Sequence, residues 1–294
     1  MEIDERTVST PDGRALSVLQ SGDLDGAPVI VHHGTPMSRL PYAGWVDDAA
    51  RDGVRLITFD RPGYGQSSPK PGRSVADVAS DVVAIADDLG LEHFVTWGIS
   101  GGGPHALACA ALLRDRVAAA ASLAGVAPRD AAGLDFLAGM GEDNVVEFSA
   151  AERGRATLEP LVAAMAKELS GTDAAAVVAA MRSLLSPVDE AVLTGDVGEF
   201  FAANMAEAVR CGTAGWVDDD LAFVQDWGFR LADIEIPVVV WQGRQDLMVP
   251  FAHGEWLAEN IPNVEAHLSD DDGHLTMVVR RVQETTAWLV GQLA

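Results

Sequence analysis

Three residues far apart in this sequence, Ser100, Asp246 and His274, could together perform nucleophilic chemistry. Ser100 is the centre of Gly98-Ile99-Ser100-Gly101-Gly102, a Gly-x-Ser-x-Gly pattern that is typical of a serine on a sharp turn between a strand and a helix. A serine hydroxyl becomes a nucleophile when a histidine takes its proton and a carboxylate orients that histidine. The five-residue pattern also recurs by chance, so the elements around it must decide whether the serine is reactive.

The residues on both sides of Ser100 predict the elements that would position it. The run that ends at Ile99 predicts a buried strand, and residues 105–113 predict a helix whose N-terminus points back at Ser100. Pro104 falls in the first turn of that helix, where its missing N–H costs nothing. The free N–H groups and partial positive charge of such a helix end suit a developing oxyanion.

The base and its carboxylate partner are predicted on two later loops. Asp246 follows a predicted strand over 237–242, and His274 follows one over 264–268. The loops at the carboxyl ends of parallel strands meet at one edge of a sheet, where ligands bind. Four other acids are alternatives for orienting His274: Asp130, Asp270, Asp271 and Asp272. We expect the last three to form an acidic turn and a helix N-cap.

The pattern of apolar residues predicts an α/β protein. A hairpin over 7–20 and strands alternating with helices imply a mostly parallel sheet of about eight strands, covered by helices on both faces. The alternation stops from 128 to 231, where the chain is alanine-rich and mostly helical in pattern. We therefore expect a core made of 1–127 and 232–294, an inserted helical cap (lid) over 128–231, and one last helix over 273–293.

Two backbone N–H groups are expected to form an oxyanion hole. One belongs to Gly101, directly after the serine, and the other to Thr35, in the loop after the predicted strand 28–32. His32 and His33 precede that loop. Adjacent histidines on a strand point opposite ways, so they predict a structural role in the loop and no metal site. Arg61, in Asp60-Arg61, is expected to hold the loop beneath the site.

Several of these stretches resemble the capped, serine-nucleophile branch of the α/β-hydrolases, which includes esterases, lactonases and proline-iminopeptidase-like enzymes. The matching stretches are His33-Gly34-Thr35-Pro36, Asp60-Arg61-Pro62-Gly63-Tyr64-Gly65-Gln66-Ser67, Gly98–Gly102, Gly243–Asp246 and Asp272-Gly273-His274. The order Ser100, Asp246, His274 is also that of the family. The resemblance implies an α/β-hydrolase fold and hydrolysis of an ester, lactone or related small acyl substrate through an acyl-enzyme on Ser100, without a cofactor.

Other functions remain open, because the fold does not fix the function. The same triad serves aminopeptidases of the proline-iminopeptidase kind, C–C bond hydrolases and perhydrolases. An aminopeptidase would need an anionic group in the cap, for which Glu199, Glu207 and Asp218–Asp220 are available, although the three aspartates are expected to form a solvated turn. A ligand-binding receptor with a vestigial triad is an alternative of another class. The residues expected to line the substrate pocket are Met37, Trp216, Trp227, Leu247 and Met248.

Composition excludes some partners. The chain has 294 residues and a net charge of -24, with no basic run, so nucleic acid and anionic membrane surfaces are poor partners. The uncharged run from 94 to 113 contains glycines and a proline, which favour a strand and a helix over a membrane span. The acidic N-terminus does not resemble a signal peptide, and Cys109 and Cys211 are expected as free buried thiols. We therefore expect a cytoplasmic protein, a monomer or homodimer, acting on a small acyl substrate.

Overall fold

The computed structural model describes residues 3–169 and 179–293. The strands of this described part form one eight-stranded sheet in the order β1-β2-β4-β3-β5-β6-β7-β8. Strands β1 and β2 run antiparallel to their neighbours, and the others are parallel. The strands are β1 (Asp4–Ser9), β2 (Ala15–Gly22), β3 (Ala27–His32), β4 (Val54–Phe59), β5 (Phe94–Ile99), β6 (Val117–Leu123), β7 (Val238–Gly243) and β8 (Val264–Ser269).

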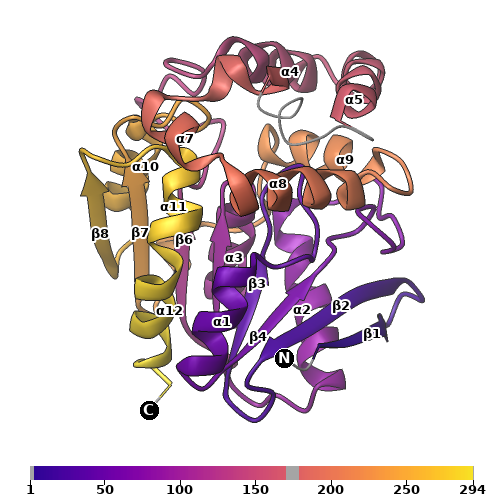
Figure 1. Ribbon diagram of the computed structural model, residues 1–294, viewed down its shortest axis with the longest axis vertical. Coiled ribbons are helices and arrows are strands. Elements are labelled where there is room, and N and C mark those ends of the chain that lie inside the picture. Colours follow the sequence, from indigo (N-terminus) through magenta and orange to yellow (C-terminus); the bar gives the residue numbers. More distant parts are fainter. Residues whose placement is uncertain (1–2, 170–178, 294) are drawn as a thin grey trace.

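The central strands are buried on both faces of the sheet. Successive side chains of a strand point to opposite sides, so each strand contributes apolar residues to both faces. In β3, for example, Val29 and Val31 join one apolar cluster and Ile30 joins the other. Helices α1 (Ala43–Arg51) and α12 (Val282–Val290) cover the first face, and α2 (Val78–Asp88), α3 (Gly102–Leu112) and α10 (Phe251–Asn260) cover the second (Figure 1). The predicted mostly parallel sheet with helices on both faces is confirmed.

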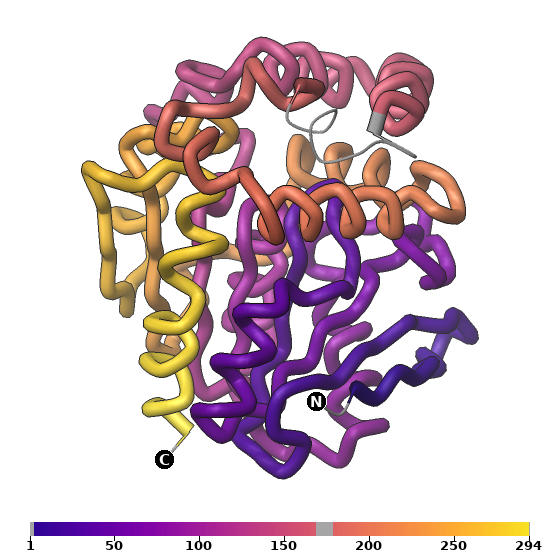
Figure 2. Tube along the Cα trace, viewed as in Figure 1, coloured from indigo at the N-terminus to yellow at the C-terminus, as the bar shows by residue number. Residues whose placement is uncertain are grey.

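The segment between β6 and β7 is helical in its described part. It contains α4 (Glu142–Glu152), α5 (Arg155–Leu169), α7 (Pro187–Val192), α8 (Gly195–Ala208) and α9 (Ala214–Phe223), with short 3-10 helices at Arg182–Leu184 and Leu231–Asp233. These α-helices gather at one end of the molecule, and the C-terminus lies at the other (Figures 1 and 2). Hydrogen bonds from Thr35 to Asp219 and from His274 to Asp189 join this segment to the loops after β3 and β8.

Two expectations are wrong. The predicted last helix is two helices, α11 (His274–Arg280) and α12, which meet at Arg281. The guanidinium of Arg281 turns back to bind Asp272 at 2.6 Å, and Arg281 itself is not helical. Of the two unpaired cysteines, Cys109 is buried as expected, but Cys211 is exposed.

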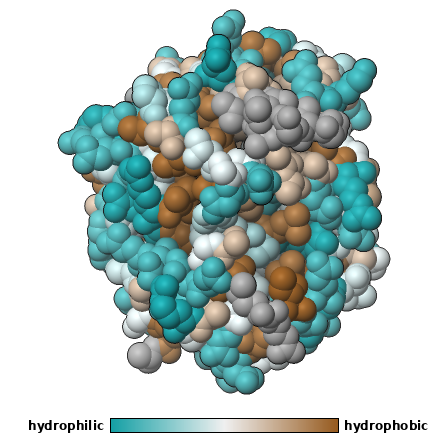
Figure 3. Space-filling view, viewed as in Figure 1, coloured by the Kyte–Doolittle hydropathy of each residue, from teal (hydrophilic) through white to brown (hydrophobic). Residues whose placement is uncertain are grey.

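A groove of about 240 Å³ lies between α1 and α12. Its walls include Trp45, Leu56, Val282 and Val290, and in the view of Figure 3 apolar residues gather near the centre of a face whose margin is mostly hydrophilic. None of the three residues predicted to react lines this groove, so it is separate from the site described below. Within the described ranges, no helix combines the length and the apolar character needed to cross a membrane.

Candidate active site

Ser100 occupies the turn between β5 and α3. Its φ of 54° lies in the left-handed region, which is uncommon and strained for a residue with a side chain. The turn is tied down on both sides, since Ser100 N donates to Leu123 O at 2.8 Å and Gly103 N donates to Ser100 O at 2.9 Å. A Cβ at Gly98 would clash with the carbonyl oxygen of Gly102, so strand and helix approach this closely only because residue 98 is glycine. The turn therefore has the geometry that its sequence motif predicts.

His274 and Asp246 form a buried pair. Nδ1 of His274 lies 2.8 Å from Oδ2 of Asp246. The other carboxylate oxygen accepts hydrogen bonds from the N–H groups of Met248 and Val249, both at 2.8 Å, and Gln242 Nε2 donates to Oδ2 at 3.0 Å. Because a carboxylate accepts from Nδ1, that nitrogen carries the proton, and Nε2 is left as the basic nitrogen.

The environment of His274 makes its imidazole more basic than usual. Burial acts to lower its pKa, but the negative charge and the hydrogen bond of Asp246 act to raise it, and Asp189 adds a weaker effect of the same sign. The net result is a pKa above the ordinary histidine value. Asp246 is thus both the hydrogen-bond partner of the ring and the main source of this shift.

The alternative acids are engaged elsewhere or exposed. Asp270 and Asp272 bind arginine side chains at 2.5 and 2.6 Å, and Asp271 and Asp130 are exposed. Within the described ranges, none of the four hydrogen-bonds the imidazole. The structure therefore brings Asp246 to His274 and leaves aside Asp130, Asp270, Asp271 and Asp272.

A carboxylate that the sequence analysis did not identify holds the backbone of His274. Asp189 on α7 accepts hydrogen bonds from the N–H groups of His274, Leu275 and Thr276 at 2.9, 2.7 and 3.1 Å. A Cβ at Gly273 would lie 2.6 Å from Asp189 Cγ, so the carboxylate fits because residue 273 is glycine. The predicted capping of this helix by the acidic turn 270–272 is wrong. Asp189 lies 85 residues before His274, and no local pattern signals the contact.

Thr35 and Gly101 lie against each other beside Ser100. A Cβ added to Gly101 would clash with Thr35 Oγ1, and one added to Gly34 would contact Ser100 Cβ at 3.5 Å. Neither the Thr35 nor the Gly101 backbone N–H donates a hydrogen bond to any residue that the structure describes. Both donors are therefore available to a ligand oxygen near Ser100.

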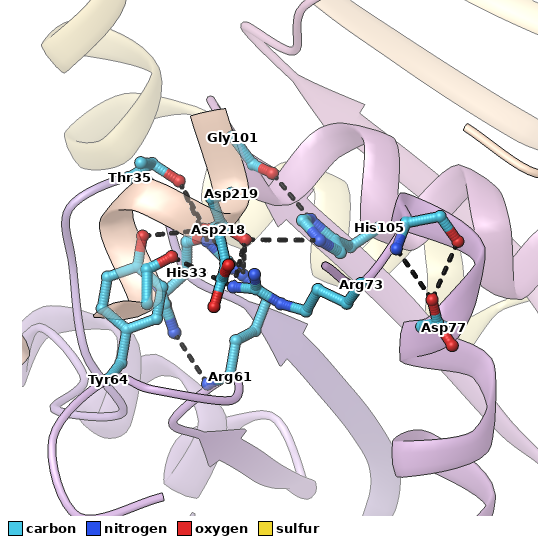
Figure 4. A network of polar contacts seen from close by, with 12 residues as sticks. His33, Thr35, Arg61, Tyr64, Arg73, Asp77, Gly101, His105, Asp218 and Asp219 are labelled. Carbon is cyan, nitrogen blue, oxygen red and sulfur yellow. Dashed lines mark hydrogen bonds and ion pairs between the residues drawn. The ribbon is translucent and has the colours of Figure 1, made fainter. Parts of the chain in front are cut away.

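A buried charged network, drawn in Figure 4, ties the Thr35 loop to α9. Thr35 Oγ1 donates to Asp219 Oδ2 at 2.9 Å and accepts from Arg61 Nη2 at 3.0 Å. The same Asp219 oxygen accepts from Arg61 at 2.5 Å and from the hydroxyl of Tyr64 at 2.8 Å. The other Asp219 oxygen accepts from Arg73 at 2.7 Å.

This network corrects the expectation that Asp218–Asp220 form a solvated turn. The three aspartates lie in α9 and are buried. Burial raises the pKa of a carboxyl group, but the guanidinium groups of Arg61 and Arg73 outweigh that effect, and the pKa of Asp219 is lowered. Three consecutive acidic residues carry no apolar period, so the sequence could not show that their helix is enclosed.

Arg61 and His33 hold the Thr35 loop, as predicted. Arg61 donates from Nη1 to His33 O and from Nη2 to Gly34 O. The His33 ring donates from Nδ1 to Gly34 O at 2.7 Å, and its Nε2 accepts from Arg61 N at 3.2 Å. Burial lowers the pKa of His33, so the ring stays neutral, as this pattern requires. In the described part of the chain, no cluster of three or more His, Cys, Asp or Glu side chains could hold a metal ion.

A cavity of about 150 Å³ opens beside Ser100, and its walls come from both the core and the helical segment. Of the residues predicted to line a pocket, Trp216 and Met248 line this cavity. Met37 lines a smaller neighbouring cavity, Trp227 lines a separate groove, and Leu247 lines none of the three. The apolar wall also includes side chains that the sequence did not single out: Met165, Met181, Leu184 and Met205.

Two carboxyl groups lie close to this site. Glu147 and Asp220 line a cavity of about 40 Å³ together with Ser100 and Gly101. Burial raises the pKa of both groups, and the two interact directly. Glu147 accepts a hydrogen bond from Trp216 Nε1, whereas Asp220 Oδ2 is buried without a partner among the described residues. Two interacting buried carboxyl groups cannot both ionise readily, so this environment favours the protonated form.

A comparison with known families identifies the class of protein. The family model described as alpha/beta hydrolase fold matches residues 27–280, and the chain belongs to this family. The fold and the relatives named below support a hydrolase.

Individual relatives carry several activities. The chain is similar to a non-heme chloroperoxidase of Streptomyces lividans (36% identity over 42% of this chain and 45% of the relative). It is also similar to the AB hydrolase superfamily protein YisY of Bacillus subtilis (26% identity over 85% of each) and to a bifunctional esterase/perhydrolase of Acinetobacter calcoaceticus (32% identity over 41% of this chain and 45% of the relative). The chain thus spans less than half the length of the first and third of these proteins.

Solved structures share the fold over nearly the whole chain. A hydrolase from Pseudomonas aeruginosa superposes with a TM-score of 0.71 at 20% identity, covering 99% of this chain and 98% of that one. A thermophilic esterase from Thermogutta terrifontis superposes with the same TM-score at 23% identity, covering 99% and 100%. At these identities the likeness establishes the architecture.

Proposed function

We propose that the protein is a serine hydrolase that cleaves an ester, a lactone or a related small acyl substrate through an acyl-enzyme on Ser100. The observation that carries the proposal is the buried Asp246–His274 pair, in which His274 Nδ1 lies 2.8 Å from Asp246 Oδ2. In the same chain, the turn between β5 and α3 presents Ser100 to a cavity. Esterases and a perhydrolase among the relatives and fold neighbours agree with this chemistry.

In the proposed reaction, Nε2 of His274 takes the proton of Ser100 while Oγ attacks the acyl carbon. The N–H groups of Thr35 and Gly101 bind the oxyanion of the tetrahedral intermediate. The imidazolium, stabilised by Asp246, then gives its proton to the leaving alkoxide, and the acyl-enzyme forms. Water attacks this ester with His274 as base, and the acid and free Ser100 are released.

The hydroxyl of Ser100 makes no hydrogen bond to a residue that the structure describes, His274 included. Such bonds are often long without a substrate and tighten in the complex. The hydroxyl is not enclosed either, because Ser100 is only half-buried. It is therefore open to a ligand in the cavity.

The helical segment 128–231 is proposed as a cap over a core made of 1–127 and 232–294. Support comes from the cavity beside Ser100, because α4, α5, α8 and α9 all contribute side chains to its wall. A substrate in that cavity would contact the cap on one side and the reactive groups on the other. The cap would then decide which acyl compounds bind.

The test is turnover of p-nitrophenyl acetate by wild type, Ser100→Ala and His274→Ala. We expect both variants to lose several orders of magnitude in kcat. A fluorophosphonate probe should label wild type at Ser100 and leave Ser100→Ala unlabelled. Full esterase activity in Ser100→Ala would refute the proposal.

A second candidate, an aminopeptidase or amino-acid esterase, is favoured by the Glu147–Asp220 pair. The other cap carboxylates considered for holding a substrate amine are less suitable, since Glu199 is exposed and Glu207 pairs with Arg39 at 2.7 Å. The matched substrates are alanine methyl ester and methyl propionate, which differ by the α-ammonium group. A preference for the alanine ester that disappears in Glu147→Gln would support this candidate, and equal rates in wild type would reject it.

A further inference from the structure

The groups proposed to react all come from the core, yet a buried aspartate of the helical segment holds each half of the site. Asp219 on α9 contacts the Thr35 loop, and Asp189 on α7 contacts the backbone that carries His274. We propose that Asp219 and Asp189 are positioning residues, the first for the oxyanion-binding loop and the second for the general base. The inference rests on the function proposed above.

Asp219 fixes the orientation of Thr35 through the hydroxyl of that residue. This hydroxyl donates to Asp219 at 2.9 Å and accepts from Arg61 at 3.0 Å, while Arg61 is itself bound to Asp219 (Figure 4). The three groups form a closed triangle of hydrogen bonds, so none of them can rotate without breaking two contacts. The N–H proposed to bind the oxyanion belongs to the same Thr35, and its direction depends on this triangle.

Arg61 extends the hold of Asp219 to the neighbouring backbone. Its guanidinium also donates to the carbonyl oxygens of His33 and Gly34, so residues 33–35 are all bound to the Asp219–Arg61 pair. The buried negative charge of Asp219 is compensated, because it faces two guanidinium groups, those of Arg61 and Arg73. Moving one member away would leave a buried charge without its partner, which is costly. The members of the network therefore hold one another in place.

Asp189 holds the backbone of His274, whereas Asp246 contacts its ring. Its carboxylate accepts from three consecutive N–H groups, of residues 274–276, and the hydroxyl of Ser186 donates to it at 2.8 Å. Asp246 orients the ring of His274, whereas Asp189 fixes the main chain from which the ring projects. Gly273 leaves the space in which the Asp189 carboxylate fits.

The first test separates positioning by Asp219 from general stability. Thr35→Val removes the hydroxyl and keeps the backbone N–H, and Thr35→Ser restores a hydroxyl. A displaced donor lowers kcat by about 10- to 100-fold, so we expect that loss in Thr35→Val, KM unchanged within about threefold, and recovery of most of kcat in Thr35→Ser. Asp219→Asn should show the same loss in kcat if circular dichroism shows it folded; if it does not fold, the threonine pair decides. Unchanged kcat in Thr35→Val, or no recovery in Thr35→Ser, would overturn the role of Asp219.

The second test addresses Asp189. Asp189→Ala removes the acceptor, and Asp189→Asn keeps one acceptor oxygen. We expect a kcat loss of about 10- to 100-fold in the first and a smaller loss in the second, both with little change in KM. Wild-type kcat in a folded Asp189→Ala would overturn the role of Asp189.

One control serves both tests. Asp196 is an exposed aspartate of α8 that accepts a hydrogen bond from the core residue Tyr42 at 2.7 Å. Asp196→Ala removes a contact between the helical segment and the core away from the site and should keep wild-type kcat. Ser100→Ala distinguishes failure of the proposed function from failure of the positioning roles. If it stays active, the proposed function fails; if it is inactive while Thr35→Val and Asp189→Ala match wild type, only the positioning inference fails.

Discussion

Nδ1 of His274 lies 2.8 Å from Oδ2 of Asp246, although the two residues come from loops after different strands. Asp246 is held by the N–H groups of Met248 and Val249, and His274 by Asp189. Asp246 cannot turn away without losing several hydrogen bonds, and the main chain that carries the His274 ring is fixed by Asp189. The pair is therefore preorganised before a substrate binds, and the predictions on pH and on Asp246 follow from it.

The acid limb of activity should lie above the ordinary histidine pKa of about 6.5. The base must be neutral, and the negative charge of Asp246 raises the pKa of His274, so kcat/KM should rise with pH through this raised value. Asp189 contributes in the same direction, so Asp189→Asn should move the limb to lower pH. Profiles from pH 5 to 9 with a p-nitrophenyl ester measure this, with Asp196→Asn as control. An unmoved limb in Asp189→Asn would contradict the prediction.

Replacing Asp246 by asparagine should inactivate the protein without unfolding it. The amide can donate to Nδ1 and so favour the imidazole tautomer whose Nε2 carries the proton and cannot act as base. We expect kcat to fall by about 10³- to 10⁴-fold. Steady-state kinetics give this number, and a thermal melt shows whether the fold survives. Asp270→Asn changes an exposed carboxylate in the turn before His274 and should keep activity. A comparable loss in Asp270→Asn would reject Asp246 as the residue that orients His274.

His253 should make stability depend on pH. Its Nδ1 accepts from Ala127 N at 3.1 Å, its Nε2 donates to Phe136 O at 2.9 Å, and burial lowers its pKa to about 4. The folded state thus favours the neutral ring. Its contribution is complete above the unfolded pKa of about 6.5 and is lost as pH falls from there towards 4, at roughly 1.4 kcal/mol per pH unit.

The measurement is urea unfolding of wild type and His253→Gln at pH 6.5, 5.5 and 4.5. Glutamine can keep a donor and an acceptor but does not titrate. The wild-type free energy of unfolding should therefore fall more steeply towards low pH than that of the variant, by roughly 1.4 kcal/mol per pH unit. Parallel curves for the two proteins would show that His253 is not held neutral.

The size of the cavity predicts a preference for short acyl chains. Its volume of about 150 Å³ is about five times the share of one water molecule in the liquid, ~30 Å³. p-Nitrophenyl acetate and butyrate should therefore be hydrolysed with a kcat/KM at least about tenfold above that of the decanoate. Met205→Ala, which shortens an apolar side chain of the wall, should raise the relative rate of the decanoate. A wild-type preference for decanoate would mean that the acyl group binds elsewhere.

Much of the core could be predicted because its signals are local. Gly98 and Gly102 around Ser100 encode a tight turn, and the apolar strand segments encode a sheet buried on both faces. The last helix was predicted as continuous because its break falls at Arg281, whose bond to Asp272 is a tertiary contact. The burial of Asp218–Asp220 could not be predicted for the same kind of reason, since their partners, such as Arg73 and Arg155, lie far away in the sequence.

The sequence by itself determined the family, the order of the strand-forming segments along the chain and the choice of Ser100 and His274 as candidates, since motif spacing and apolar period are properties of neighbouring residues. Only the tertiary structure decided which acid meets His274, and that Asp189 and Asp219 reach the site from the helical segment. The physical reason is that hydrogen bonds and ion pairs act over a few ångströms in space. Residues 85 and 184 positions apart become partners only when the chain folds.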